Sequence, residues 1–291
     1  MAHQVPLDQP WRGLARLTRM AVMAIEDCLA SVSPVDWSQL PVLLCVAEHD
    51  RPGRVDGIDD RLMNDIANEI GVTFAPESVL ICHGRTGVAA ALMHARNLIH
   101  QKNAERVLIV ATDSLVTRRT LAHYEQHDRL LTPSNSNGFM PGEGASAFLI
   151  GMPTGTGELV CAGVGFGTET AHIDSGEPLR ADGLTHAHKA ALAELGRSMD
   201  DVDYRVTDLS GEHYYFKEAS YAYGRLLRKR TGDPALWHPA ECTGAGGSAL
   251  GGICLAVALA AVVGGYAPGR TALLHFSDDN GRRASVVCLG G

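Results

Sequence analysis

One stretch, from Ser78 to Leu115, constrains the fold of this chain more than any other. It opens with an apolar run at Val79–Cys82, turns at the glycine-flanked segment HGRTG, and continues with apolar or small residues at helical spacing. A second apolar run follows at Val107–Ala111. This order predicts a strand, a tight turn, a helix and a strand. At such a turn the unpaired backbone N–H groups and the helix dipole stabilise an anion, so the residue on the turn decides the chemistry.

The rest of the chain alternates strand-like and helix-like segments in two halves. Helical spacing predicts helices at 14–29, 58–70, 117–124, 184–195, 213–229 and 250–263, and apolar runs predict strands at 42–47, 145–150, 159–164, 204–209, 271–276 and 284–289. Because the second half repeats the element order of the first, we predict an α/β fold with mostly parallel sheets buried on both faces. We expect one integrated domain built from halves at 1–151 and 152–291.

The net charge and the cysteine pattern limit which partners and which cellular compartment we expect for this chain. The formal net charge is −8 with scattered Lys and Arg, so nucleic acid and anionic membranes are not expected partners. The seven cysteines form no CxxC or zinc spacing and lie mostly in apolar runs, which indicates reduced thiols in the cytoplasm. We therefore expect no metal and no cofactor. The polar first ten residues predict no signal peptide, and 253–263 is too short and glycine-rich to span a bilayer.

Two motifs carry a resemblance to a known family. Asn137–Ala145 (NGFMPGEGA) resembles the GF-x-x-GEGA motif of β-ketoacyl synthases in the thiolase superfamily, and Ala104–Thr117 (AERVLIVATDSLVT) is similar to the family's "ADVALVGGADSL" segment. The resemblance implies a layered αβαβα fold of two pseudo-repeated halves that works as a homodimer or heterodimer. The family's first strand is short or missing here, which leaves the N-terminal sheet edge open as a pairing surface.

The resemblance also implies a Cys–His–His catalytic set, and all three positions differ in this chain. The family cysteine falls on Gly84, the first histidine on Asp208, and the second on Cys242. The loop between the last two strands, 277–283, reads as a polar hairpin turn without the family's gating phenylalanine. The glycines that shape the fold are kept. We therefore expect no catalytic residue from the family's set.

Several nearby groups leave alternatives open. Cys82 lies two residues before the corner and reads as a core cysteine or as a displaced nucleophile. His238 enters the pocket under a rival alignment, and otherwise belongs to a Trp-His-Pro turn. His213 with Glu212 either takes an acid–base role or begins a helix that Asp208 or Ser210 caps.

The sequence supports three functions. The first is a ketosynthase-like pseudoenzyme: a non-catalytic subunit, adaptor or accessory partner that pairs with itself or with a related or accessory protein. The second is an acyltransferase of the 3-oxoacyl-carrier synthase type with a rearranged site, in which Cys242 is the nucleophile and His238 or His213 the base. The third is a protein that holds an acyl or CoA group without turning it over. An acyl carrier protein or a CoA thioester is the expected small partner. Arg118, Arg119 and the run Arg225–Arg230 are interpreted first as solvated helix faces, and alternatively as a contact for an acidic carrier-protein helix.

Overall fold

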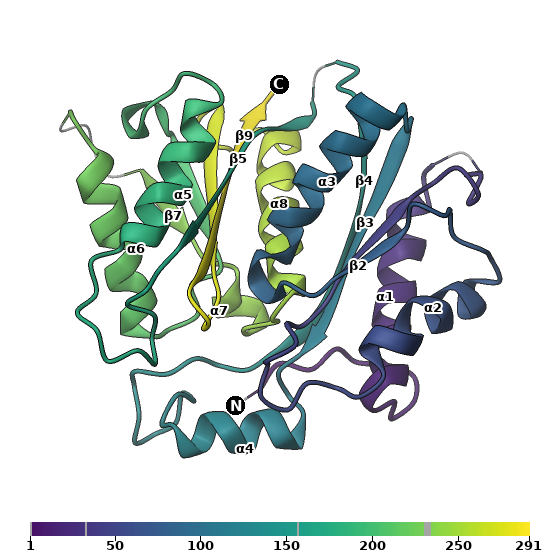
Figure 1. Ribbon diagram of the computed structural model, residues 1–291, viewed down its shortest axis with the longest axis horizontal. Coiled ribbons are helices and arrows are strands. Elements are labelled where there is room, and N and C mark those ends of the chain that lie inside the picture. The colour runs from purple at the N-terminus through teal and green to yellow at the C-terminus, as the bar shows by residue number, and fades with distance from the viewer. Residues whose placement is uncertain (1, 33, 156, 230–233) are drawn as a thin grey trace. The chain divides into compact units, whose positions relative to one another are not determined.

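The computed structural model describes residues 2–32, 34–155, 157–229 and 234–291, and the chain divides into two compact units. The first unit comprises Met1–Met152 with Thr243–Gly252, and the second comprises Pro153–Cys242 with Ile253–Gly291. Each unit holds one β-sheet with helices packed against it (Figure 1). The α/β class predicted from the sequence is confirmed.

The first sheet has four strands in the order β2-β1-β3-β4. Their bounds are β1 Val42–Cys45, β2 Val79–Ile81, β3 Arg106–Ser114 and β4 Glu143–Gly151. β1 pairs in parallel with β2 and β3, while β4 runs antiparallel to β3 over nine consecutive residue pairs. β1 and the centre of β3 are fully buried, which explains their uninterrupted apolar sequences.

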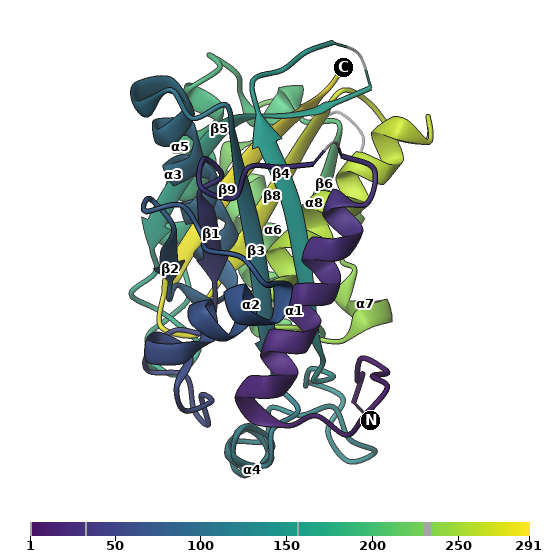
Figure 2. The ribbon, with the colours of Figure 1, turned by 90° about the vertical axis from the view of Figure 1, so that its right-hand side faces the viewer.

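Helices cover both faces of this sheet. They are α1 Gly13–Leu29, α2 Met63–Ile70 preceded by a π-helical turn at Ile58–Leu62, and α3 Gly87–Lys102. A further helix, α4 Arg118–Gln126, follows β3. α1 lies along β4 and β3 (Figure 2), and its buried side chains join those of α2, β1 and β3 in one core cluster. α3 packs on β3 and β1 from outside that cluster.

The second sheet has five strands in the order β5-β9-β8-β6-β7. Their bounds are β5 Leu159–Thr168, β6 Tyr204–Thr207, β7 Ala235–Trp237, β8 Thr271–Ser277 and β9 Arg282–Gly290. β9 is antiparallel to both of its neighbours, and the other pairs are parallel. The 277–283 segment is the predicted hairpin turn, closed by a hydrogen bond from the Asp278 N–H to the Arg282 carbonyl oxygen.

The helices of the second half are α5 Asp182–Ala193, α6 His213–Leu226, α7 Ala240–Thr243 and α8 Ala249–Val263. α5 packs on β5 and β9 and also on α6. Three alternate glycines of β5, Gly163, Gly165 and Gly167, permit this approach, because a Cβ on each would overlap a backbone oxygen of α5. No described helix combines the length and apolarity that crossing a bilayer requires.

The structure adds one strand that the sequence did not predict. β7 is only three residues long and includes Trp237, which was interpreted as part of a turn. The other predicted helices and strands are present within a few residues of their expected bounds, and 132–141 is irregular as expected.

Candidate functional site

The turn after β2 is the candidate catalytic corner. β2 ends at Ile81, a 3-10 turn spans Gly84–Thr86, and α3 begins at Gly87. The Gly84 N–H donates to the carbonyl oxygen of Val46 at 3.1 Å, which ties the corner to the end of β1. The predicted strand, turn and helix are therefore confirmed, and Gly84 lies buried at the entry to the helix.

Gly84 gives the corner its backbone shape but no reactive group. Its φ of +50° lies in the left-handed region that favours glycine. Thr86 braces the turn by donating through Oγ1 to the His83 carbonyl oxygen at 2.9 Å. The position matched to the acyl-carrying cysteine thus has no atom that can form a thioester.

Cys82 does not take over that role from the neighbouring strand end. Leu80 and Cys82 pack against the core cluster that α1 and α2 supply, on the opposite side of the sheet from α3. The Cys82 thiol donates to Asp59 Oδ1 at 3.4 Å and lies 3.5 Å from Arg54 Nη2. Cys82 is therefore only half-buried and belongs to a polar cluster, which corrects its interpretation as an ordinary core cysteine.

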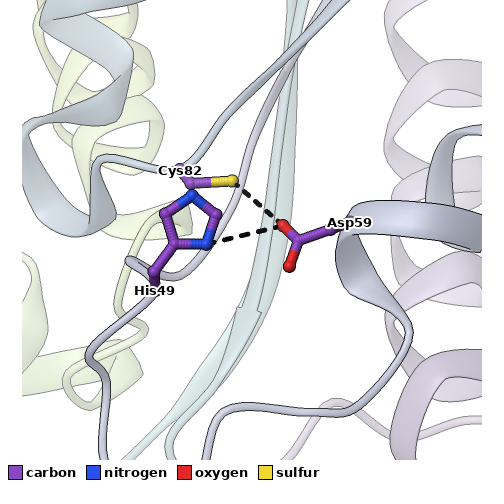
Figure 3. A group of neighbouring side chains, drawn as sticks. All are labelled: His49, Asp59 and Cys82. Atoms are coloured by element: carbon purple, nitrogen blue, oxygen red, sulfur yellow. Dashed lines mark hydrogen bonds and ion pairs between the residues drawn. The ribbon is translucent and has the colours of Figure 1, made fainter.

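His49, Asp59 and Cys82 bring three potential metal-ligand atoms within 4.8 Å of one another (Figure 3). The carboxylate is already occupied, because Arg54 donates to both Asp59 oxygens at 2.7 and 2.6 Å. This ion pair lowers the pKa of Asp59, while burial and the bond to Asp59 raise the pKa of the Cys82 thiol. The cluster therefore favours a bound guanidinium over a metal cation.

The order of these groups also differs from that of a thiol catalyst. Asp59 Oδ1 meets both the thiol and the imidazole, which lie on the same side of it (Figure 3), and His49 Nδ1 is 3.7 Å from that oxygen. A cysteine nucleophile needs a base on the thiol and a lowered thiol pKa. Here the thiol meets a carboxylate and its pKa is raised.

A cleft of about 630 Å³ lies where β3 ends and β4 begins. Ser114, the last residue of β3, donates to Glu143, the first residue of β4, at 2.8 Å. Arg16 of α1 donates to both Glu143 oxygens through Nε, at 2.9 and 3.0 Å. The two motifs that carried the family resemblance therefore meet at this cleft, at the sheet end where ligands bind in open α/β folds.

The cleft is cationic. Five arginines contribute to its lining: Arg12, Arg16, Arg54, Arg118 and Arg119. Three of them have carboxylate partners, since Arg16 pairs with Glu143, Arg54 with Asp59, and Arg119 with Asp56 at 3.6 Å. Arg12 and Arg118 are exposed and have no ion-pair partner within the described part of the chain. The cleft therefore presents positive charge to solvent.

A second buried network holds the glycine-rich segment 243–252 to the end of β3. Arg51 donates to both Glu48 oxygens at 2.6 and 2.7 Å and to Asp113 at 3.2 Å. Asp113 also accepts from the Ser248 N–H at 2.9 Å. Gly247, with φ +56°, sits so close to Asp113 that a Cβ would overlap the carboxylate. The aspartate of the TDSL segment, Asp113, is thus a structural anchor.

In the second unit, Asp208 anchors the turn into β9 and does not cap a helix. Its Oδ2 accepts from the Ser277 N–H at 2.8 Å, and its side chain is buried. The N-cap of α6 is Glu212, with no side-chain cap bond. The predicted capping by Asp208 or Ser210 is therefore wrong, because Ser277 uses the carboxylate. His213 is the first residue of α6 and is exposed.

His238 and Cys242 lie on and before the short helix α7. His238 Nδ1 is 3.1 Å from Glu241 Oε1 and its ring meets Phe216 edge-on, with centroids 5.5 Å apart. The Nδ1–Glu241 distance is that of an ion pair, but its geometry is not that of a hydrogen bond. Cys242 is exposed, and its thiol has no hydrogen-bond partner among the described residues. No hydrogen bond joins the Cys242 thiol to His238 or His213 in the described part of the chain.

Sequence reasoning missed the arginines that organise these networks, Arg16, Arg51 and Arg54. Arg16 reaches Glu143 across 127 positions and Arg51 reaches Asp113 across 62, so no local spacing reveals these two contacts. Arg51–Glu48 and Arg54–Asp59 are local pairs, which the sequence analysis did not single out. One signal was present: Glu143 is a lone acid in a run of glycine and alanine, and a buried carboxylate requires a cation or several donors.

Comparison with known proteins identifies the fold. No family model and no curated protein matches this sequence. Among solved structures, the chain is similar to the AntDE:AntF complex, a type II PKS acyl-carrier protein with its ketosynthase bound to the hexaketide. The TM-score is 0.79 at 15% identity, covering 100% of this chain and 88% of the other.

Two further solved structures are similar to this chain in fold. The ketosynthase from module 6 of the bacillaene synthase of Bacillus subtilis 168 gives a TM-score of 0.72 at 13% identity, covering 96% of this chain and 58% of that one. The ApeO ketosynthase in complex with its chain length factor ApeC, from Xenorhabdus doucetiae, gives 0.65 at 13% identity, covering 96% and 80%. At these identities the likeness concerns the fold, and it confirms the predicted thiolase-like architecture.

Proposed function

Starting from the ketosynthase fold of this chain, we propose that it is a non-catalytic subunit that binds a ketosynthase and works with that enzyme's acyl carrier protein. The observation that carries this proposal is Gly84, a glycine in the left-handed region at the corner where an acyl-carrying cysteine would be needed. Asp208, committed to the Ser277 N–H, adds support from the second half.

The comparisons favour this role over that of an isolated adaptor. Solved structures of this fold include ketosynthases in complex with a chain length factor and with an acyl-carrier protein. A chain that keeps the fold and lacks the nucleophile fits the position of the non-catalytic member of such a pair. The rearranged enzyme is less well supported, because no hydrogen bond joins the Cys242 thiol to His238 or His213 among the described residues.

Co-expression with a ketosynthase from the same source tests the proposal. We expect the two chains to co-elute at equal stoichiometry, and condensation of an acyl group with a malonyl-loaded carrier to require both. Serine in place of the ketosynthase's own cysteine should abolish the product, while substitution of Cys242 should not. A β-ketoacyl product formed by this chain alone would overturn the proposal.

The cationic cleft is the proposed contact for the carrier. Acyl carrier proteins present acidic helices, and exposed arginines without partners attract such a surface. Arg118→Glu should weaken carrier binding roughly fivefold at low salt, because a reversed exposed charge acts mainly through long-range attraction. Lys189→Glu, on the exposed side of α5, is the matched control and should leave binding unchanged. Equal effects of the two variants would exclude this cleft as the carrier contact.

A further inference from the structure

Two of the seven cysteines face each other across the sheet of the second unit. Cys161 of β5 is paired with Cys288 of β9 in the antiparallel ladder, and their Sγ atoms lie 3.7 Å apart. No other hydrogen bond joins two thiols among the described residues. This contact therefore distinguishes Cys161 and Cys288 from the remaining cysteines of the chain.

The backbone hydrogen bonds show which kind of cross-strand pair this is. The Gly291 N–H donates to the Glu158 carbonyl oxygen at 3.1 Å, so Glu158 and Gly291 form a hydrogen-bonded pair of the ladder. Hydrogen-bonded and non-hydrogen-bonded pairs alternate, and Cys161 and Cys288 lie three steps further along, at a non-hydrogen-bonded position. The Cα atoms of such a pair are about 4.5 Å apart, within the range of about 4.4–6.8 Å that a disulfide spans.

A small side-chain movement is enough to join the two sulfur atoms. An S–S bond is about 2.05 Å long, so the Sγ atoms must approach each other by roughly 1.7 Å. Paired residues of an antiparallel ladder project from the same face of the sheet, and rotation about the Cα–Cβ bond of Cys161 moves its sulfur without moving the backbone. The register shift between Cys161 and Gly163 lies beside this residue, where the strand bends.

The two thiols differ in their access to solvent. Cys161 is partly exposed on β5, which ends the second sheet, whereas Cys288 is fully buried. The hydrogen bond with Cys161 and burial raise the pKa of Cys288 well above its usual value, so Cys288 stays a neutral thiol. A small oxidant therefore reaches Cys161 first, and Cys288 lies beside it as a resolving thiol.

From this geometry we propose that Cys161 and Cys288 form a reversible oxidative modification site whose oxidant is a hydroperoxide. The Cys161 sulfur attacks a peroxide oxygen, the O–O bond breaks, and with hydrogen peroxide one water leaves, which converts Cys161 to a sulfenic acid. The Cys288 sulfur then attacks the Cys161 sulfur, so the S–S bond forms, the S–O bond breaks, and a second water leaves with the Cys288 proton. Two thiols lose two electrons in total, and the peroxide gains them.

Reversal uses the same exposed sulfur. A dithiol reductant attacks Cys161, forms a mixed disulfide and then closes on itself, which returns both cysteines to thiols. The Cys288 sulfur is buried and need not be reached by either reagent. The site does not depend on the function proposed above.

The disulfide fastens an edge strand that is otherwise weakly held. β5 pairs only with β9, its residues 159–162 are all partly exposed, and it contains glycines at 163, 165 and 167. Glycines within a strand weaken it. The bond joins residues that are 127 positions apart, so it strongly restricts the opened chain and favours the paired strand.

Titration of the reduced full chain with hydrogen peroxide, followed by unfolding and alkylation of the remaining thiols, tests the proposal. We expect the protein to lose the mass of two hydrogen atoms, and the seven alkylated thiols to become five because two are joined. Trypsin should release peptide 130–180, which contains Cys161, linked to peptide 284–291, which contains Cys288. Excess dithiol should restore all seven thiols. Seven free thiols after peroxide treatment, or a link between other cysteines, would overturn the proposal.

Three serine variants test the two roles. Cys161→Ser should abolish the disulfide and leave Cys288 unmodified, because Cys288 is buried. Cys288→Ser should also abolish it but leave Cys161 as a sulfenic acid, which dimedone traps. Cys242→Ser removes the exposed thiol and is the matched control, with disulfide formation at the wild-type rate. If Cys288→Ser does not fold, Cys161→Ser decides, and an intramolecular disulfide that persists in Cys161→Ser contradicts the assignment.

Hydrogen exchange measures the effect of the bond on β5. The Val160 amide lies in the hydrogen-bonded pair next to Cys161 and should exchange at least about tenfold more slowly in the oxidised protein. Amides of β1, in the first unit, are the internal control and should be unchanged. Equal exchange of the Val160 amide before and after oxidation would contradict the fastening of β5.

Discussion

β4 and β9 hold the same place in the two halves, as the antiparallel strand beside the last parallel one, but differ in what lies on their far side. β9 is paired by β5 over most of its length, and β4 has no such neighbour. The covering helix differs with it: α5 packs on β5 and β9, while α1 packs on β4 and β3. In each half the helix packs on the two strands at one end of the sheet. The first sheet has no strand equivalent to β5, and α1 accordingly packs on β4 and β3.

This difference separates how the two halves are stabilised. The second half adds β5 beyond β9, and the glycines of β5 let α5 approach closely. The first half keeps side chains on β4, with Ala145, Ala147 and Leu149 packed into the core beneath α1. No strand among the described residues pairs with the outer side of β4.

Removing the buried carboxylate of the second half should have the largest effect. Arg283 donates to both Glu218 oxygens at 2.8 and 3.0 Å, and both side chains are fully buried. Glu218→Ala leaves a buried guanidinium without its counter-ion, which costs about 3–5 kcal/mol. Urea unfolding monitored by circular dichroism measures the loss.

The first half supplies the matched control for that variant. Glu143→Ala also removes a buried carboxylate, but Arg16 is 16% exposed and keeps water as a partner. We expect a smaller loss, about 1–3 kcal/mol. Equal losses at Glu218 and Glu143 would contradict the contrast between the halves.

Mild acid should destabilise the second half specifically. Burial, with Arg205 nearby, lowers the pKa of His188 to about 3, and burial with His188 beside it lowers the pKa of His275 well below its usual value. In the unfolded chain both histidines are protonated as the pH falls through about 6.5, whereas in the folded protein they stay neutral. Their contribution to the free energy of unfolding is therefore constant above that pH and decreases below it. The slope is about 1.4 kcal/mol per pH unit for each histidine.

Urea midpoints between pH 7.5 and 5 would reveal this slope. No histidine of the first unit is buried among the described residues, so the effect belongs to the second. Both ring nitrogens of His275 lack a hydrogen-bond partner, which makes His275→Phe a mild change above pH 7. That variant should reduce the slope, and a slope unchanged by it would refute the assignment.

Adding a methyl group to a glycine of β5 should lower the free energy of unfolding more than adding one to a glycine of β4. A Cβ on Gly165 would overlap the Ala187 carbonyl oxygen and lie 2.5 Å from the Ala191 N. Gly165→Ala should therefore cost about 1–3 kcal/mol. Gly144→Ala is the matched change in β4, where the Cβ would only touch Ala249 at 4.0 Å, and should cost less than about 0.5 kcal/mol. Thermal unfolding of both variants measures the difference.

The helix starts give the smallest expected effect. Glu169 accepts from the Ala171 N–H at 3.1 Å and from the Gly183 N–H at 3.0 Å in the first turn of α5. The N-cap residue of α1, Arg12, makes no side-chain hydrogen bond to the first turn of the helix. Glu169→Ala should cost about 1–2 kcal/mol, and Arg12→Ser should gain about 0.5–1 kcal/mol. If Arg12→Ser instead lowers the free energy of unfolding, Arg12 makes a stabilising contact in solution and the missing cap is not the dominant effect.

Much of the fold was predictable because strands and helices each have a characteristic spacing of apolar residues that can be read from the local sequence. Val79–Cys82, the turn at Gly84 and the apolar run at Val107 were enough to predict the central unit. β7 was missed because three residues carry no period. Asp208 was assigned to a helix cap on local grounds, whereas Ser277, 69 positions away, uses its carboxylate.

The candidate site was predictable only in part. Gly84 was located on the corner because the glycine-flanked turn is local, and the structure places it there with a positive φ. The position of Cys82 follows from strand alternation, but its bonds to Asp59 and Arg54 depend on a loop whose path the sequence does not specify. The cationic cleft likewise combines residues of the arm, α1, the loop at 53–56 and the ends of two strands.

Intact-protein mass spectrometry after incubation with an acyl-loaded carrier protein, at pH 7.5 and a large excess of acyl donor, distinguishes a non-catalytic subunit from an acyltransferase. We expect no covalent acyl adduct, because Gly84 offers no nucleophile and no hydrogen bond joins the Cys242 thiol to a base among the described residues. A stoichiometric mass gain equal to one acyl group, lost on Cys242→Ala, would contradict it and identify a catalyst with a relocated nucleophile.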